Sequence, residues 1–152
     1  MANIFNEDFR DFIAALNNNH VKYILVGGFA VILHGHSRVT GDMDIWIKPT
    51  EENYIKLVSA FKEFGMSLFD MTKSNFLSVN KFDVFSFGRK PVAIDIMTKV
   101  KGLNFDEAYQ QSKIFNDDGL LIRALHFNDL ILAKRESGRL KDIDDIDQLN
   151  KE

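Results

Sequence analysis

The sequence contains no cysteine, which excludes disulfide bonds, thiolate zinc sites and cysteine nucleophiles together. It also lacks internal repeats and low-complexity segments, and its loop-like stretches are short. Of its 152 residues, 45% are hydrophobic and 27% are charged, and a chain of this length buries enough surface to fold without a crosslink or a structural metal. We therefore expect a single domain that spans residues 1–152.

Long hydrophobic runs are absent as well. The longest apolar run covers residues 29–33, far fewer than the roughly 20 residues that cross a bilayer as a helix. Charged side chains, among them Glu7, Asp8 and Arg10, occupy the positions where the apolar part of a signal peptide would lie. These features predict a cytoplasmic protein that has no membrane partner.

A surplus of basic residues is also missing. Lysine and arginine number 19 against 22 aspartates and glutamates, which gives a formal net charge of -3, whereas proteins that bind nucleic-acid duplexes usually carry a basic stripe. Long nucleic acid is therefore a poor candidate partner. Phenylalanine, in contrast, is abundant, with 14 copies, which predicts an aromatic-rich core and leaves open an exposed aromatic face.

The hydrophobic periodicity predicts helices that alternate with strands early in the chain and strands that cluster later. The expected helices cover residues 7–18, 29–34, 51–64, 104–111, 128–136 and 140–149, and the expected strands cover residues 23–26, 42–47, 81–87, 91–97 and 120–124. Thr50 is the expected N-cap of the third helix, which ends at Gly65. This order predicts an α+β domain in which a small mixed β-sheet carries helices packed mainly on one side, with closing helices at about 126–150.

Two aspartates stand side by side on the predicted strand over residues 42–47. Asp42 and Asp44 are two residues apart, so their side chains point to the same face, while Met43 and Ile45 point to the core. Adjacent carboxylates repel each other, and a bound Mg²⁺ would remove that repulsion because hard cations prefer oxygen ligands. The alternative is a solvated strand face near a turn.

A third aspartate, Asp95, lies within the apolar strand over residues 91–97. A carboxylate in such a strand is costly to bury, so it faces either water at an edge or a functional site. If this strand lies beside the strand of Asp42, three carboxylates converge on one surface. Such a set suits two metal ions that stabilise the attacking and leaving oxygens of a phosphoryl displacement.

A glycine pair, Gly27-Gly28, directly follows the strand over residues 23–26 and precedes a helix. Glycine lets the backbone approach a phosphate closely, and a helix N-terminus offers free N–H groups to an anion. No Gly-Lys-Ser/Thr follows, so the pair is not a Walker loop, and the third glycine of the dinucleotide fingerprint is missing. The alternative is a plain turn from strand to helix.

Taken together, these motifs resemble the polymerase-β-like nucleotidyltransferase superfamily, whose signature is a Gly-Gly or Gly-Ser pair, a gap of one helix, and Asp-x-Asp on a strand. The chain matches it at Gly27-Gly28, at Asp42-x-Asp44 and at the distant Asp95. The fuller pattern, with Arg38 and the closing residues 130–146, is similar to the bacterial AbiEii-type and antibiotic-nucleotidyltransferase branch. The resemblance covers about residues 23–149.

The resemblance implies a polymerase-β palm-like fold and the metal-dependent transfer of a nucleoside monophosphate from a nucleoside triphosphate, with ATP expected. Asp42, Asp44 and Asp95 would be the catalytic residues and the ligands of Mg²⁺ or Mn²⁺, while Gly27 and Gly28 would bind the nucleotide phosphates. The acceptor stays open between a small molecule, a protein and tRNA. Many members carry serine where this chain has Gly28, and many have a large C-terminal domain that this sequence does not include.

Three basic residues have two interpretations each. Arg38 would bind the triphosphate or neutralise Asp42, or it is a surface arginine. Lys134 and Lys141 would contact phosphate, although solvated helix faces are the favoured interpretation. Of these three basic residues, only Arg38 is expected to bind the nucleotide.

Histidines and aromatic residues give weaker signals. His34 and His36 diverge at the end of a helix, so metal binding by them is not expected, and His34 is interpreted as a structural contact. Trp46 and Phe85 are expected in the core, with a base pocket as the alternative.

A different class of function also fits the fold. The domain would then be a non-enzymatic or antitoxin-like module that binds a protein partner, or a homo-oligomer, through its aromatic face. Retention of three carboxylates on one face favours the enzyme, because nothing structural requires them there. An accidental Asp-x-Asp in a generic α+β domain is the least favoured alternative.

Overall fold

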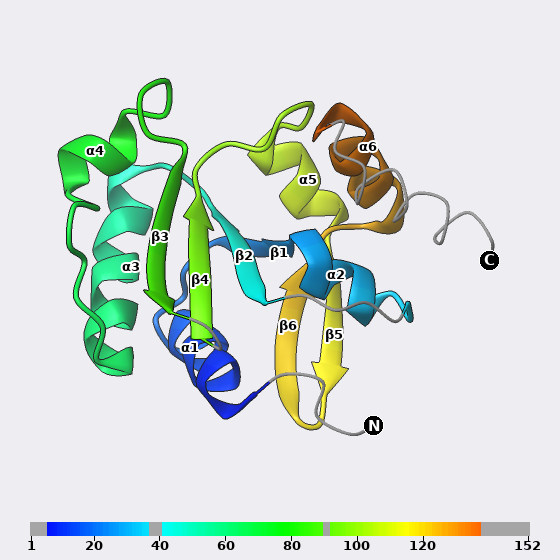
Figure 1. Ribbon diagram of the computed structural model, residues 1–152, viewed down its shortest axis with the longest axis horizontal. Coiled ribbons are helices and arrows are strands. Elements are labelled where there is room, and N and C mark those ends of the chain that lie inside the picture. The colour runs from blue at the N-terminus through cyan, green and yellow to red at the C-terminus, as the bar shows by residue number, and fades with distance from the viewer. Residues whose placement is uncertain (1–5, 37–40, 90–91, 138–152) are drawn as a thin grey trace.

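The computed structural model describes residues 6–36, 41–89 and 92–137, which form one mixed β-sheet flanked by helices (Figure 1). The described strands are β1 (Tyr23–Val26), β2 (Asp42–Ile47), β3 (Val84–Arg89), β4 (Val92–Met97), β5 (Lys113–Asp117) and β6 (Leu120–Ala124). The described helices are α1 (Glu7–Asn18), α2 (Gly27–Leu33), α3 (Glu51–Phe64), α4 (Lys73–Leu77), α5 (Phe105–Gln111) and α6 (Phe127–Ser137).

The strand order is β3-β4-β2-β1-β6-β5. Strand β2 pairs antiparallel with β1 and parallel with β4, and β1 pairs parallel with β6. Two antiparallel pairs, β3–β4 and β5–β6, complete the two edges. The α+β class and the mixed sheet predicted from the sequence are therefore confirmed.

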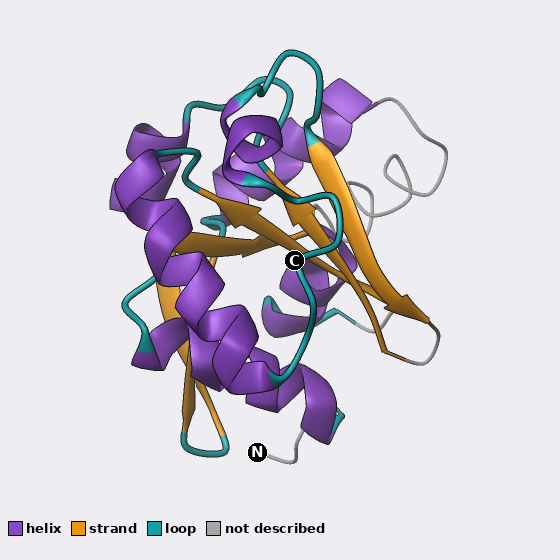
Figure 2. Ribbon diagram, turned by 90° about the vertical axis from the view of Figure 1, so that its left-hand side faces the viewer, coloured by secondary structure: helices purple, strands orange, loops and turns teal. Residues whose placement is uncertain are grey.

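The two faces of the sheet are covered differently. The long helices α1 and α3 pack against each other and against one face, where Phe61 of α3 lies 5.6 Å from Phe12 of α1 and 5.0 Å from Phe87 of β3, between ring centroids. Figure 2 shows these long helices as a layer against the twisted sheet. On the opposite face Phe105 of α5 packs edge-on against Trp46 of β2, with ring centroids 5.1 Å apart.

Local signals at the helix ends explain several of the boundaries. Asn6, Thr50 and Asn104 each accept a hydrogen bond from a backbone N–H of the first turn, as N-caps do. Gly65 ends α3 in the left-handed conformation, with φ of 86°, which costs glycine little. The predicted cap Thr50 and stop Gly65 are thus confirmed.

Strand β5 and helix α4 were not predicted from the sequence. Strand β5 is an edge strand with little apolar alternation, and its Ile114 is 52% exposed. The turn that joins it to β6 contains Asp118 and Gly119, both with positive φ, which is the Asp-Gly signal of a tight hairpin. Helix α4 has five residues, which is too short to show a helical period.

Several predicted boundaries also differ. The strand expected over residues 81–87 is β3 (Val84–Arg89), which begins three residues later. Helix α2 begins at Gly27 and not at Phe29, so the glycine pair forms the first helical turn. Of the expected closing helices, α6 is described, whereas the helix expected over 140–149 lies outside the described residues. Within the described part of the chain, no helix is both long and apolar enough to cross a membrane.

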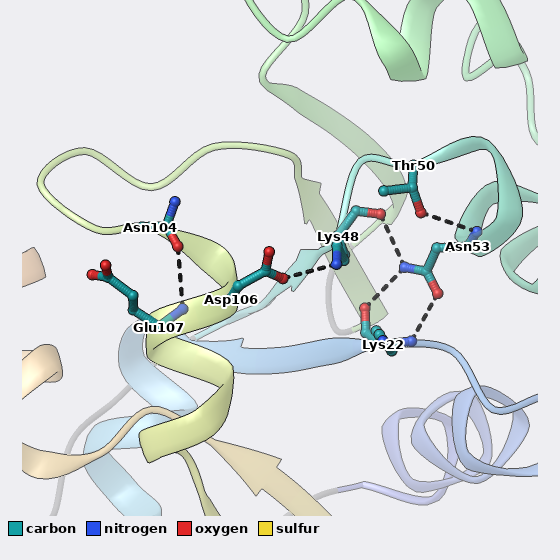
Figure 3. Close-up of polar contacts among 7 residues, drawn as sticks. All are labelled: Lys22, Lys48, Thr50, Asn53, Asn104, Asp106 and Glu107. Carbon is teal, nitrogen blue, oxygen red and sulfur yellow. Dashed lines mark hydrogen bonds and ion pairs between the residues drawn. The ribbon is translucent and has the colours of Figure 1, made fainter.

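One buried amide joins three elements where β1 begins and β2 ends (Figure 3). The side chain of Asn53, in the first turn of α3, is 3% exposed. Its Oδ1 accepts a hydrogen bond from the backbone N–H of Lys22 at 2.8 Å, and its Nδ2 donates to the carbonyls of Lys22 and Lys48 at 3.0 and 2.9 Å. Asn53 therefore fixes the start of β1, the end of β2 and the start of α3 relative to one another.

We predict that Asn53→Ala lowers the free energy of unfolding by on the order of 3 kcal/mol, because it leaves buried backbone groups without partners. Urea denaturation measures the change. Asn18→Ala is the matched control: this amide is exposed and donates to the Glu63 carboxylate at 3.0 Å, so its effect should stay within about 0.5 kcal/mol. Equal effects of the two substitutions would contradict the role of Asn53.

Candidate active site

The pairing of β2 with β4 brings the three predicted carboxylates to one face of the sheet. Asp44 is the register partner of Asp95, and Asp42 is the partner of Ala93. Side chains of register partners on neighbouring strands point to the same face, and Asp42 shares that face with Asp44. The sequence left open whether these two strands are neighbours, and the structure shows that they are.

Asp44 is the most perturbed carboxyl of the site. Burial raises its pKa to about 7, and the negative charge of Asp95, a hydrogen bond with Asp95 and the charge of Asp42 add to the rise, while Lys134 opposes it. A proton on Asp44 relieves its repulsion with the neighbouring carboxylates. With a pKa of about 7, Asp44 keeps this proton up to about neutral pH.

Gly27 lies directly against Asp44. Val26 is the register partner of Asp44 on β1, and Gly27 follows it with φ of 68°. A Cβ atom at Gly27 would collide with Asp44 Oδ2 and would lie 3.1 Å from its Cβ and Cγ. Position 27 therefore requires glycine for two reasons, the positive φ and the contact with the carboxylate.

A cavity of about 130 Å³ opens beside Asp44 and Gly27. Its opposite wall comes from α6 and includes Leu130 and Lys134. Lys134 is 5% exposed, which is rare for a lysine, and its charge acts on Asp44. The favoured interpretation of Lys134 from the sequence, a solvated helix face, is therefore wrong. Its spacing of four residues from the buried Leu130 was the available signal.

The donor chemistry of this face fits a hard divalent cation, because it presents three carboxylates whose mutual repulsion a cation would relieve. Across residues 6–36, 41–89 and 92–137, however, no three aspartate, glutamate or histidine side chains are grouped closely enough to hold a metal ion. A cation bound at Asp44 would also displace the proton that its raised pKa retains up to about neutral pH.

The remaining candidate residues have structural roles or lie outside the description. His34 Nε2 donates to the carbonyl of Leu125 at 2.8 Å, and burial lowers its pKa, so its ring is neutral and structural. Trp46 and Phe85 are buried core residues. Gly28 is buried in the first turn of α2. Arg38 and Lys141 lie outside the described residues.

Comparisons with known proteins agree with this geometry. The model of a family described as "Nucleotidyltransferase of unknown function (DUF6036)" matches residues 7–150. A search of curated proteins finds no match.

Three solved structures have a similar fold. The lincosamide antibiotic adenylyltransferase LnuA, bound to lincomycin, has a TM-score of 0.58 at 16% identity, over 97% of this chain and 98% of that one. The antibiotic-resistance factor ANT(2'')-Ia has a TM-score of 0.60 at 15% identity, over 95% and 81%. An antigenic nucleotidyltransferase-like protein from Paracoccidioides brasiliensis has a TM-score of 0.51 at 14% identity, over 97% and 77%. At these identities the likeness shows the nucleotidyltransferase fold, as predicted.

We predict that the metal-free protein loses stability as pH rises from about 4 to about 7. In that window the folded state keeps a proton on Asp44, whose pKa is raised to about 7, while the unfolded chain has released it. The free energy of unfolding therefore falls with rising pH, by on the order of 3 kcal/mol for this group. Urea denaturation across this range should show the loss in wild type and in Asp83→Asn, but not in Asp44→Asn. Parallel curves for all three proteins would refute the assignment.

We also predict that Gly27→Ala destabilises the protein more than Gly65→Ala. Both glycines have positive φ, but an added Cβ at Gly65 meets nothing within 4 Å. The control should cost about 1–2 kcal/mol for backbone strain, and Gly27→Ala a further 1–3 kcal/mol, roughly, for the collision with Asp44. Thermal or urea unfolding compares the two, and equal costs would show that Asp44 moves away freely.

Proposed function

This chain belongs to the DUF6036 family of nucleotidyltransferases, and on that basis we propose that it transfers a nucleoside monophosphate from a nucleoside triphosphate, with ATP as the expected donor, to an acceptor hydroxyl. The observation that carries the proposal is the register of Asp44 with Asp95, with Gly27 packed against the same carboxylate. The finer AbiEii-type assignment stays a prediction.

In the proposed reaction the acceptor oxygen forms a bond to the α-phosphorus. The bond from that phosphorus to the oxygen that bridges the β-phosphate breaks, and pyrophosphate leaves with the electron pair. Asp95 orients the acceptor hydroxyl and takes its proton, as a positioned general base does. The protein's contribution is chiefly position and charge, as in other phosphoryl transfers.

Asp42, Asp44 and Asp95 are the proposed ligands of Mg²⁺ or Mn²⁺, which when bound supplies charge neutralisation at the phosphates and the reacting oxygens. The backbone N–H groups of Gly27 and Gly28 are the proposed contacts of the β- and γ-phosphates. Arg38 stays a proposed nucleotide contact.

Lys134 joins the proposed site from the far wall of the cavity. Its side chain is buried, and its charge acts on Asp44 across the cavity. Because the cavity lies between Gly27, Asp44 and Lys134, we place a phosphate of the donor there, in contact with Lys134. In this arrangement Lys134, which was expected on a solvated helix face, neutralises charge on the phosphate.

The acceptor is proposed by class. The structural neighbours include an adenylyltransferase bound to lincomycin and one in complex with adenylyl-2''-tobramycin, so hydroxylated small molecules are the first acceptors to test. Protein and tRNA acceptors follow.

A second candidate function is a binding module of the same fold. Apolar side chains are exposed at the edge strand β3 and near it, where Phe69 is 73% exposed, Val84 44% and Phe82 38%. An exposed apolar edge of this kind suits a protein partner or a second copy of the chain. The raised pKa of Asp44 favours the enzyme, because structural packing does not need clustered carboxylates.

The test measures transfer of label from ATP marked on its α-phosphate to lincosamides, aminoglycosides, tRNA, a co-encoded protein and the chain itself. We expect metal-dependent transfer, and Asp95→Asn should lower kcat by about 10²–10⁴-fold while the affinity for ATP stays within about threefold. Asp42→Asn combined with Asp44→Asn should weaken both. Asp83→Asn changes an exposed carboxylate directly before β3. It is the control and should match wild type.

Two results decide against the enzyme. One is ATP binding by wild type without label on any acceptor, together with a protein partner that co-purifies. The other is an Asp95→Asn variant that transfers label at the wild-type rate.

A further inference from the structure

A second and larger cavity, of about 660 Å³, lies at the opposite end of β1 from the carboxylates. Its walls come from the end of α1, the start of β1, α3, α5 and the β5–β6 hairpin. The volume falls within the range of sites that hold small molecules, roughly 300–1,000 Å³. It shares no lining residue with the cavity beside Asp44. Strand β1 separates the two by three residue steps, or roughly 10 Å.

The charge of this cavity is of one sign. Lys22, Lys56 and Arg123 line it, and none of its lining residues is acidic. Burial raises the pKa of the lining Tyr23 to about 12, so its hydroxyl stays neutral at physiological pH. In a chain with net charge -3, such a surface attracts anions selectively.

Nearby carboxylates only partly offset this charge. Glu52 lies 3.6 Å from Lys56 as a pair along the surface of α3, a geometry that contributes little. Glu63 accepts hydrogen bonds from the amides of Asn18 and Asn19. Neither carboxylate lines the cavity.

Arg123 is the best-placed anchor for an anion. Its guanidinium lies over the ring of Tyr109, 4.3 Å from the centroid, and donates from Nη1 to Ser112 Oγ at 2.8 Å. Among the residues that the structure describes, no carboxylate forms an ion pair with this half-buried arginine. A guanidinium fixed on two sides keeps further N–H donors for a carboxylate or a phosphate.

The wall also includes apolar side chains, and hydrogen bonds hold its backbone in place. Ile114 and Leu121 are 52% and 53% exposed, and both line the cavity. Contact with a bound apolar group would explain why these two apolar side chains are exposed. Asn17 holds the hairpin by donating to the carbonyl of Leu121 at 2.8 Å. On the other rim, Asn53 clamps the backbone of Lys22 (Figure 3). The cavity is therefore preformed, which lowers the entropic cost of binding.

We propose that this cavity is a second ligand site, separate from the carboxylates, for a small molecule that has an apolar or aromatic body and one oxyanion. Arg123 binds the oxyanion through its guanidinium. Lys22 and Lys56 add long-range attraction at the rim. Ile114 and Leu121 contact the apolar body.

The probes are phenyl phosphate and benzoate, with phenol as the neutral match of the same ring. NMR titration of the full chain follows the Arg123 Nε–H signal and the Tyr109 ring. Both oxyanions should shift these signals, and their relative affinities distinguish a phosphate from a carboxylate ligand. Phenol should bind at least about tenfold more weakly. If phenol binds equally well, or if neither oxyanion shifts the Arg123 signal, the proposal is overturned.

Variants locate the binding independently of folding. Arg123→Gln should weaken phenyl phosphate binding about tenfold, while Arg135→Gln, at an exposed arginine on α6, should leave it unchanged.

Because Arg123 also packs on Tyr109, a second pair of variants keeps the test decisive if Arg123→Gln misfolds. At the exposed Leu121, Leu121→Asp should weaken binding about tenfold and Leu121→Lys should tighten it. Unchanged binding in this pair contradicts the site.

A last variant separates this site from the proposed active site. Phenyl phosphate should bind the Asp42→Asn, Asp44→Asn double variant as it binds wild type. Loss of binding in that variant would move the probe to the carboxylates and overturn the proposal, whatever the outcome of the transferase assay.

Discussion

The parallel pairing of β2 with β4 is the constraint on which the rest of the site depends. It sets Asp44 opposite Asp95, and the antiparallel pairing of β2 with β1 sets Gly27 against the same carboxylate. A shift of either register by one residue would turn Asp44 to the face covered by α1 and α3. The buried apolar residues that alternate with the aspartates, such as Met43 and Ile45, oppose that shift. The hydrophobic core therefore fixes the position of the charged groups.

This arrangement concentrates like charge where burial makes it expensive. Two features lower this cost: the proton that Asp44 retains and the buried side chain of Lys134, whose charge acts on Asp44. Both features are reversible, because Asp44 can release its proton and the Lys134 side chain can turn toward another anion. In the proposed reaction, a cation or a phosphate would replace them at groups that are already desolvated, where electrostatic interactions are stronger than in water.

Much of this could be predicted from the sequence, because it rests on local patterns. Asp42 and Asp44 share a face through the period of a strand, and Thr50 and Gly65 mark the ends of α3. Other features depend on contacts between distant segments. Nothing local shows that Gly27 touches Asp44 or that Asn53 binds the backbone of Lys22, since each contact depends on how elements pack. Strand β5 was not predicted for a related reason, because an exposed edge strand lacks the apolar alternation by which strands are recognised.

The order of the strands also has a kinetic consequence. Helices α3 and α4 and strand β3 all lie between Asp44 and Asp95 in the chain. The parallel partner of β1 is β6, which lies near the end of the described chain. Pairings between such distant segments close late and slow folding. A nascent chain that has made only its first two strands carries Asp42, Asp44 and Gly27 but no third carboxylate. The three carboxylates can therefore share one face only after β4 has been made and has paired with β2.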